Sequence, residues 1–431
     1  MDRVMPRKPK YLSKAGDVEL GRRHKPDYWL VIICAVLLLI GVVVVYAIGP
    51  ALQVTTHLSA SYYTSRQLLA IALCVIAFLI TASIPIAAWK RFYKPVAILA
   101  LGATLLAIVL PVNPSYPAHR WVRLGGLSFQ SVELVKFAVI IWLAFFLVRA
   151  IKNNTITDFK KTLWPILVAL VVIGVLIAGV QSDLGSMGVI VAIMATMSFV
   201  AGLPLKKIAI IGCIIVAGLI LAISIFPYRR ARLETYLHPS SNCQTASGYQ
   251  ACQALIAVGS GGIFGLGLGH SVQAYGYEPE ADNDSIFAIY AETFGFFGCV
   301  ILLALFAGLF SRLKNIAEKI DDDFSRLIVV GVLTWLSVQT IINVGAMVGL
   351  LPLKGITLPF ISYGGTSIVF AAAAIGVVFQ ISRYTSYKSP GTNTYDDSNN
   401  RRQLDEDRLN RRRVRGAYHP TPGGSIRTKE A

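Results

Sequence analysis

The sequence predicts an all-α, polytopic membrane protein that crosses the bilayer about ten times, with both termini in the cytoplasm. Three observations support this fold class. Of the 431 residues, 55% are hydrophobic and only 15% are charged, whereas about a quarter of the residues in a soluble domain are charged. The mean hydropathy is +0.61. Long apolar runs recur along the chain, and the basic residues cluster between them and at the two ends.

A helix needs about 20 apolar residues to cross the hydrocarbon core. We therefore expect spanning helices near 28–48, 68–88, 95–111, 134–150, 162–180, 186–203, 207–226, 285–310, 326–347 and 366–382. Residues 1–27 are predicted to form a basic cytoplasmic segment, and 28–382 the membrane domain. The polar, strongly charged stretch 383–431 is predicted to be a disordered basic cytoplasmic tail.

The positions of the basic residues predict the orientation. Lys and Arg crowd the N-terminal segment and recur in alternate turns: Lys90, Arg91, Lys94, Lys152, Lys160, Lys161, Lys206, Lys207, Arg312 and Lys314. Cytoplasmic loops carry such an excess of positive charge. The longer polar segments 112–133 and 227–284 should therefore face outward, the second as a large loop between helices seven and eight. The net charge of +17 does not indicate nucleic acid, because no nucleic-acid module accompanies it.

Cysteine and histidine spacing indicates no metal site. Cys243 and Cys252 share the outer loop. A disulfide between them is plausible if that loop faces an oxidising compartment, and the sequence leaves the pairing open.

Ionisable residues at membrane depth are candidates for function. The first group is Arg120, Glu133 and Lys136, in AHRWVRLGGLSFQSVELVKFAVI. Glu133 and Lys136 share one helix face and can neutralise each other. One interpretation is a structural ion pair. The other is an anion site in which Arg120 and Lys136 bind phosphate.

The second group is acidic. Asp183, in QSDLGSM, could cap the following helix or pair with a cation such as Lys136. Glu280, Asp282 and Asp284 precede the eighth predicted helix directly. Asp284 could cap that helix, or act as a partly desolvated base with a raised pKa. Glu292, two turns further in, should face protein or a wet cavity.

The stretch LLPLKGITLPFISYGGTSIVF contains prolines and glycines that interrupt helical order near membrane depth. Non-helical backbone at that depth must be buried in protein or line a cavity. We therefore expect a re-entrant turn that helps to form a cavity open to the outer face, lined by carboxylates and cations. The residues alone do not separate an enzyme from a carrier.

These segments resemble the signature stretches of the SEDS family, the shape, elongation, division and sporulation proteins. The resemblance lies in HRWVRLGGLSFQSVELVKFA, QSDLGS, GYQACQALIAVGSGGIFGLGLGHSVQ with EPEADNDSIFAIYAE, and GITLPFISYGGTS, and covers roughly residues 28–385. YRRARLETYLHP and GHSVQ are more similar to the division branch, FtsW, than to the elongation branch, RodA. Two family motifs are altered: FQSVE replaces FQPSE, and Asp282 and Asn283 replace the His-Thr pair.

The resemblance implies a peptidoglycan glycosyltransferase that polymerises lipid II in septal cell-wall synthesis, at the outer face of the bacterial cytoplasmic membrane. It assigns the catalytic carboxylate to Asp284, with Asp282 as a rival. It places Arg120, Glu133, Lys136, Asp183 and Glu280 at the substrate. A divalent cation, Mg²⁺ or Mn²⁺, is a candidate aid to the departing pyrophosphate. The implied partners are membrane lipids, a class B penicillin-binding protein and other division proteins.

Three other functions stay open at this point. They are an elongation-type polymerase, a carrier that flips lipid II, and a scaffold of low activity that recruits a partner. The candidate residues lie mostly toward the outer side, which favours the enzyme over a carrier that needs ionisable groups in both leaflets.

Overall fold

The structure is a computed structural model that describes residues 25–384. Gaps in the description are 57–58, 111–119, 125–126, 354 and, apart from Glu234, Tyr236 and Cys243, residues 226–245. The predicted N-terminal segment lies almost wholly outside the described residues, as does nearly all of the predicted C-terminal tail.

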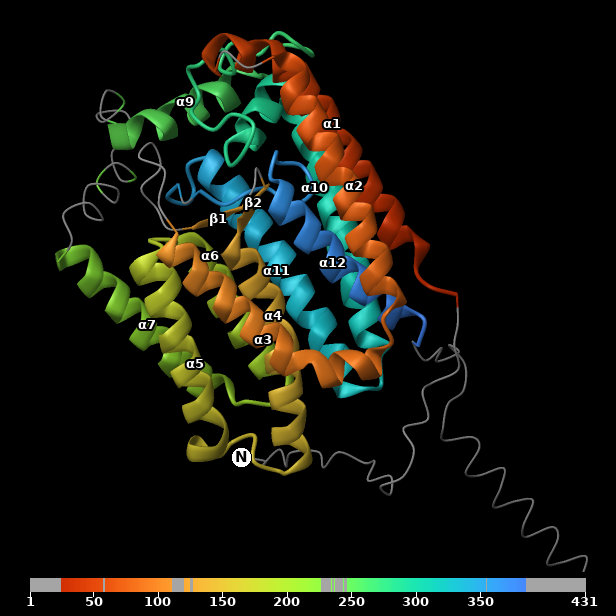
Figure 1. Ribbon diagram of the computed structural model, residues 1–431. Helices are drawn as coiled ribbons and strands as arrows, with labels where there is room; N and C mark the ends of the chain where they lie inside the picture. Colours follow the sequence, from red (N-terminus) through yellow and green to blue (C-terminus); the bar gives the residue numbers. More distant parts are fainter. Residues whose placement is uncertain are drawn as a thin grey trace, which may run out of the picture. The chain divides into compact units, whose positions relative to one another are not determined.

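The predicted all-α membrane architecture is confirmed (Figure 1). The long helices are α1 (Tyr28–Thr56), α2 (Ala60–Ser83), α3 (Ile86–Val109), α4 (Ser131–Lys152), α5 (Trp164–Gly174), α6 (Leu184–Val200), α7 (Leu205–Ile225), α10 (Ile286–Glu318), α11 (Asp323–Met347) and α12 (Gly365–Ser382). Short π-helical turns, η1 (Phe159–Leu163) and η2 (Val175–Val180), flank α5. In the described part, eight helical segments are long and apolar enough to span a membrane. The number of crossings and the side of each end stay predictions.

The second and third helices differ most from the predicted bounds. α2 ends at Ser83 and α3 begins at Ile86, although the sequence predicted a start near 95. Pro85 stands at the N-cap of α3, where its fixed φ favours the start of a helix. Lys90, Arg91 and Lys94 therefore belong to the first turns of α3, and long basic side chains tolerate that place because they reach toward water.

Both predicted outer segments contain regular structure. Segment 112–133 holds an antiparallel hairpin of β1 (Trp121–Leu124) and β2 (Leu127–Gln130), in which Trp121 faces Gln130. Segment 227–284 holds α9 (Ala246–Ser260), and a disulfide joins Cys243 to Cys252. α9 and the loops after it lie at one end of the bundle, and the turn from α4 to α5 lies at the other (Figure 1).

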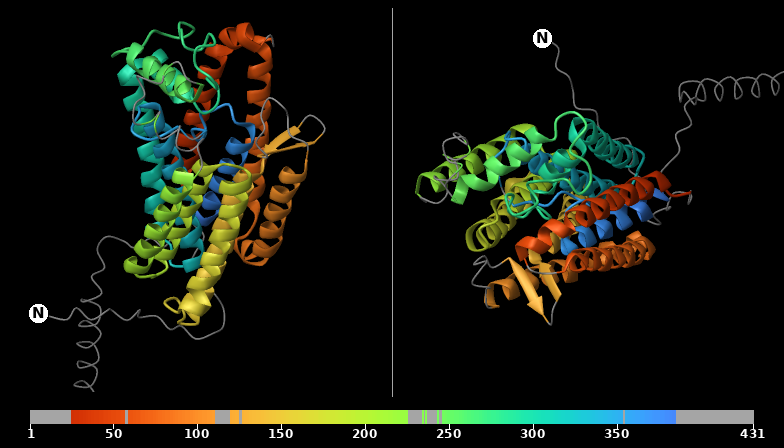
Figure 2. Two further views of the ribbon diagram at one scale, coloured as in Figure 1. Left: turned by 90° about the vertical axis from the view of Figure 1, so that its left-hand side faces the viewer. Right: turned by 90° about the horizontal axis from the view of Figure 1, so that it is seen from above.

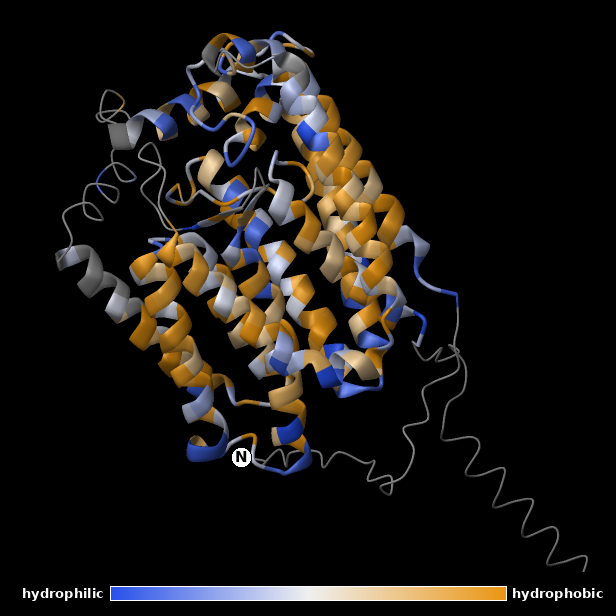
Figure 3. Cartoon of the chain, in the orientation of Figure 1, coloured by the Kyte–Doolittle hydropathy of each residue, from blue (hydrophilic) through white to orange (hydrophobic). Residues whose placement is uncertain are grey.

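The best-buried helices are α4, α11 and α12, with 67%, 67% and 83% of their apolar windows inside the protein. α12 packs along α2, and α11 packs against α4, α6 and α10. Two further views show the long helices running side by side along the bundle (Figure 2). Hydrophobic residues predominate along the middle of the bundle, and hydrophilic residues are more frequent toward its two ends, as a membrane requires (Figure 3).

The contact between α2 and α12 depends on a glycine. A Cβ atom at Gly376 would lie 2.1 Å from Thr81 Oγ1 and 2.7 Å from the carbonyl oxygen of Phe78. Small residues let transmembrane helices approach this closely, and packing rather than hydrophobic transfer holds such helices together in lipid.

We expect Gly376→Ala to destabilise the protein by about 1–3 kcal/mol, because overpacking forces the two helices apart. The measurement is thermal unfolding of the full chain in detergent. Gly102→Ala on α3 is the matched control, since a Cβ there meets no atom within 4 Å. Equal melting temperatures for the two variants would contradict the prediction.

Candidate functional site

Asp284 lies in the turn that leads into α10. The helix begins at Ile286 with Ser285 at the N-cap, which makes no side-chain capping bond. Asp284 Oδ1 is buried, and within the described residues it has no hydrogen-bond partner. The capping interpretation of Asp284 is therefore wrong, and its carboxylate is left available for other contacts.

The non-helical segment 348–364 lies against this turn. The predicted interruption of helical order is confirmed, because α11 ends at Met347 and α12 begins at Gly365, and most side chains from Ile356 to Ser362 are buried. Gly355 has φ +60°, and a Cβ there would lie 3.3 Å from Asp284 Oδ2 and 3.9 Å from Arg120 Nη1. Gly355 thus lies close to both the carboxylate and the guanidinium, and a side chain there would crowd Asp284 Oδ2.

Arg120 reaches this place from the start of the β1–β2 hairpin. Its Nε donates to the carbonyl oxygen of Gln181 at 2.9 Å, and its Nη2 donates to that of Ser182 at 2.8 Å. These two bonds fix the plane of the guanidinium. Its third nitrogen, Nη1, is the one near Gly355 and Asp284. The structure therefore brings together two of the predicted site residues, Arg120 and Asp284.

Two amides of α11 hold the surrounding backbone in place. Asn343 Nδ2 donates to the carbonyl oxygens of Asp284 and Ile356, both at 2.7 Å. Gln339, one turn earlier, donates through Nε2 to the carbonyl oxygen of Thr357 at 3.0 Å. The sequence prediction missed both residues. The available signal was a pair of polar residues spaced four apart on one face of an otherwise apolar helix.

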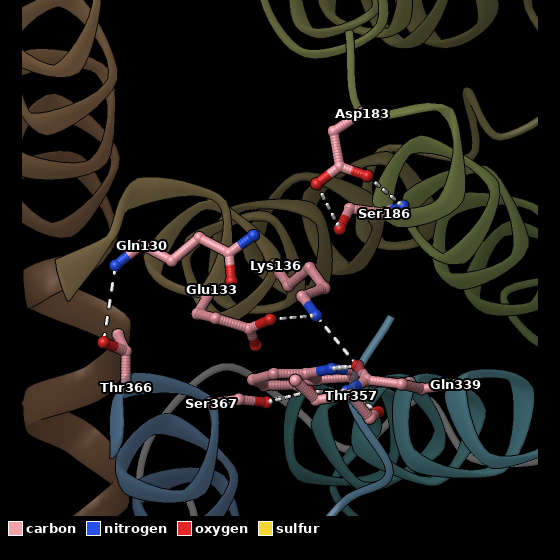
Figure 4. A network of polar contacts seen from close by, with 10 residues as sticks. Gln130, Glu133, Lys136, Asp183, Ser186, Gln339, Thr357, Thr366 and Ser367 are labelled. Atoms are coloured by element: carbon pink, nitrogen blue, oxygen red, sulfur yellow. Dashed lines mark hydrogen bonds and ion pairs between the residues drawn. The ribbon is translucent and has the colours of Figure 1, made fainter. Parts of the chain in front are cut away.

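Glu133 and Lys136 form a buried ion pair on α4 (Figure 4). Lys136 Nζ lies 2.7 Å from Glu133 Oε1 and 2.8 Å from Gln339 Oε1, and 5.0 Å from the centre of the Trp335 ring. The whole of Lys136 is 1% exposed, and Glu133 is 3% exposed. This geometry favours the structural ion pair over a phosphate site at Lys136. Gln339 links the pair to the segment after α11, since its Oε1 accepts from Lys136 and its Nε2 donates to the carbonyl oxygen of Thr357.

Asp183 caps α6. Its carboxylate accepts the backbone N–H of Ser186 at 3.0 Å and the Ser186 hydroxyl at 2.9 Å. The ion pairs of the described residues do not include one between Asp183 and Lys136. Capping is thus the structural role of Asp183, and it orients the adjoining carbonyl of Ser182 that holds Arg120.

Glu280 shapes the turn before α10. It has φ +54°, a conformation that is uncommon outside glycine. Its carbonyl oxygen accepts the N–H groups of Asn283 and Ser285, and its carboxylate accepts from Asn283 Nδ2 at 3.3 Å. The tight turn brings the Glu280 charge close to both Asp282 and Asp284.

Burial, followed by the negative charge of Glu280, raises the pKa of Asp284 to about 7. Asp282 adds to this rise, and Arg120 opposes it. The same two leading causes raise the pKa of Asp282 to about 6. A carboxyl group whose pKa lies near neutral pH suits general-base chemistry, because the proton-accepting form is both present and basic.

Glu278 is an acidic residue that the sequence prediction did not single out. It is 3% exposed, and both of its carboxylate oxygens are buried. Burial raises its pKa to about 8; the neighbouring Ser285 side chain opposes this rise, and the charge of Asp284 adds to it. The signal was the alternation of acids in EPEADND. Glu292 is buried in protein, as predicted, and accepts from the Ser271 hydroxyl and the N–H of Val272.

Within the described ranges, no group of three or more His, Cys, Asp and Glu side chains is arranged to hold a metal ion. A Mg²⁺ ion that is bound by one or two carboxylates together with substrate phosphates needs no such group. The divalent cation therefore stays a prediction, and the reaction proposed below has no step that depends on it.

The buried pair generates a prediction for stability. Lys136→Met should destabilise the protein by about 3–5 kcal/mol, because it leaves the Glu133 charge buried without a partner. Glu133→Gln combined with Lys136→Met should recover most of that loss. Thermal unfolding of the parent, both single variants and the double variant measures the coupling free energy. Additive effects of the two changes would count against the structural ion pair.

Comparison with known proteins gives consistent matches. The sequence model of the FtsW/RodA/SpoVE family, described as cell cycle protein, matches residues 28–387. Stage V sporulation protein E of Bacillus subtilis is 36% identical over 367 residues, which cover 85% of this chain and 99% of that protein. The probable peptidoglycan glycosyltransferase FtsW of Coxiella burnetii is 36% identical over 368 residues, 83% of this chain and 96% of that protein.

Two solved structures share the fold. One, described as "Structural coordination of polymerization and crosslinking by a peptidoglycan synthase complex", has a TM-score of 0.67 and 26% identity, covering 84% of this chain and 99% of that one. The rod shape determining protein RodA of Thermus thermophilus has a TM-score of 0.61 and 25% identity, covering 84% of this chain and 98% of that one. On these matches, the chain is a membrane-embedded member of the FtsW/RodA/SpoVE family, also known as the SEDS family.

Proposed function

We propose that this protein is a peptidoglycan glycosyltransferase that polymerises lipid II into glycan strands for the division septum. The observation that carries the proposal is Asp284, a carboxylate with an unpartnered buried oxygen that lies, like the Arg120 guanidinium, close to Gly355. Relatives of similar length named as probable peptidoglycan glycosyltransferases FtsW support the reaction and the division role.

In the proposed reaction, Asp284 takes the proton from the 4-hydroxyl group of the acceptor sugar. That oxygen attacks the anomeric carbon of the donor sugar, the bond to the pyrophosphate breaks, and undecaprenyl pyrophosphate leaves. Arg120 Nη1 is the cationic group of the described site that is free to face the growing negative charge. Lys136 is assigned to the ion pair with Glu133 instead.

We place the site at the outer face of the cytoplasmic membrane. α9 carries the Cys243–Cys252 disulfide and contacts the site, since Gln250 Nε2 donates to Ser285 Oγ at 3.0 Å. Disulfides persist in oxidising compartments. The basic turn with Lys160 and Lys161 lies at the opposite end of the bundle (Figure 1), as the positive-inside rule requires if the site faces outward.

A class B penicillin-binding protein is the proposed partner, since one structural relative is a peptidoglycan synthase complex that coordinates polymerisation with crosslinking. Crosslinking needs a transpeptidase, and a polymerase beside it would hand over its product directly. The assay of function should therefore include that partner.

Asp284→Ala should lower the rate of glycan synthesis by about 10²- to 10⁴-fold, the usual contribution of a positioned base. The measurement is polymerisation of labelled lipid II by the purified protein with its cognate partner. Asp282→Ala is the matched control and should retain most of the rate. A parental rate for Asp284→Ala would refute the base assignment. Vesicle translocation of lipid II without glycan synthesis by the parent would favour the carrier.

The pKa of Asp284 predicts the pH profile. A base must be deprotonated to act, so kcat/KM should fall as pH decreases through about 7. Glu280→Gln removes the largest charge that raises this pKa, and should move the midpoint to lower pH. Arg120→Gln removes the opposing cation, and should move the midpoint upward. Shifts of the same sign in the two variants, or an unchanged profile in both, would contradict the assignment of Asp284.

A further inference from the structure

Two adjoining cavities lie between α3, α4 and α5, away from the Asp284 site. The first, of about 780 Å³, is bounded by the start of α3, the end of α4 and the turn that follows. The second, of about 480 Å³, runs along the facing sides of α3, α4 and α5. Ala97 and Trp142 line both cavities, so the second continues from the first.

The first cavity is basic and aromatic. Lys94 of α3, Arg149 of α4 and Lys161 of η1 line it from three different elements. Among the described residues, none of the three forms an ion pair, whereas the nearby Lys90 is paired with Asp322 at 3.1 Å. The nearest acid in the turn, Asp158, accepts the backbone N–H groups of residues 160 and 161 as a helix cap. Three cations of one cavity therefore have no acidic partner among the described residues, and together they can bind an anion.

Aromatic stacking holds the wall of this cavity. The rings of Tyr93 and Phe145 stack with their centres 3.9 Å apart, and Lys94 Nζ lies 5.9 Å from the centre of the Tyr93 ring. Trp142 stacks on Phe146 at 5.6 Å at the junction with the second cavity. Aromatic side chains favour the depth at which lipid headgroups meet hydrocarbon.

The second cavity is apolar. Alanine, valine, leucine, isoleucine and tryptophan supply nearly all of its lining, which along α3 runs from Ala97 to Thr104. At about 1.5 Å per residue, this stretch is about 10 Å long, enough for the first half of an acyl chain. A free phosphate ion would occupy only the first cavity and would leave this apolar cavity empty.

We propose that these cavities form a binding site for one anionic glycerophospholipid. Its phosphate binds between Lys94, Arg149 and Lys161, and one acyl chain lies between α3, α4 and α5. Basic pockets between transmembrane helices bind anionic headgroups in this way. The lipid would fasten the two spans that are least buried by protein, Ile86–Val109 at 17% and Phe159–Val180 at 22%, onto α4.

The test is native mass spectrometry of the full-length protein titrated with phosphatidylglycerol or with phosphatidylcholine of equal chain length. The parent should bind phosphatidylglycerol about tenfold or more tightly than phosphatidylcholine. The triple variant Lys94→Gln, Arg149→Gln, Lys161→Gln should lose this preference. Its control changes the neighbouring cations that do not line the cavity: Arg91→Gln, Lys152→Gln, Lys160→Gln. The control variant should keep the preference.

A second pair of variants tests the acyl-chain cavity. Ala97→Phe fills the junction and should weaken binding of phosphatidylglycerol, whereas Leu99→Phe, on the exposed side of the same helix, should not. Equal loss in the two triple variants would show that only diffuse charge attracts the lipid and overturn the site. Displacement of bound phosphatidylglycerol by equimolar undecaprenyl phosphate would overturn the choice of ligand. None of these results depends on glycan synthesis.

Discussion

The site depends on one buried side chain, the amide of Asn343. Its nitrogen donates to the carbonyl oxygens of Asp284 and Ile356, which are 59 and 13 residues away along the chain. A buried carbonyl group that is left without a hydrogen bond costs several kcal/mol. Because a single amide satisfies both, the turn before α10 and the non-helical segment after α11 hold a fixed distance from each other. That fixed distance also keeps Asp284 and Arg120 close to Gly355.

Charge is distributed along the bundle in a way that supports this arrangement. Near Asp284 the acids predominate, so the carboxylates repel one another and burial raises their pKa values. Arg120 is the opposing cation, and its position is fixed by backbone carbonyls instead of by an acidic partner. The Glu133–Lys136 pair lies deeper and carries no net charge. A neutral buried pair contributes little electrostatic potential at Asp284. The pKa of Asp284 is therefore set by its burial and by the charges nearest to it.

The long helices could be predicted from the sequence, but the hydrogen bonds that hold the site in place could not. Apolar runs of sufficient length mark the long helices, whereas α9 in the outer loop was not predicted, and the start of α3 was missed because its first turns carry Lys90, Arg91 and Lys94. The resemblance pointed to Asp284 and Arg120, and the structure brings both close to Gly355. The spacing of Gln339 and Asn343 could be seen in the sequence, but the partners of Asn343 could not, since a hydrogen bond to a backbone carbonyl does not depend on the partner's side chain. Glu278 was passed over because the sequence does not show that its side chain turns inward.

Two non-helical segments can coexist here because side chains of neighbouring helices make the hydrogen bonds that the backbone lacks. One helix supplies acceptors for backbone N–H groups, and another supplies a donor for backbone carbonyl groups. Glu292 of α10 has only acceptors, and it takes the N–H groups of Val272 and Gln273 in the loop after α9. Asn343 of α11 donates to two backbone carbonyl groups, that of Asp284 before α10 and that of Ile356 after α11. The backbone carbonyl of Asp284 is thus held by the Asn343 amide. Because the Asn343 amide holds the turn, Asp284 Oδ1 can stay without a hydrogen-bond partner and accept a proton from a substrate hydroxyl group.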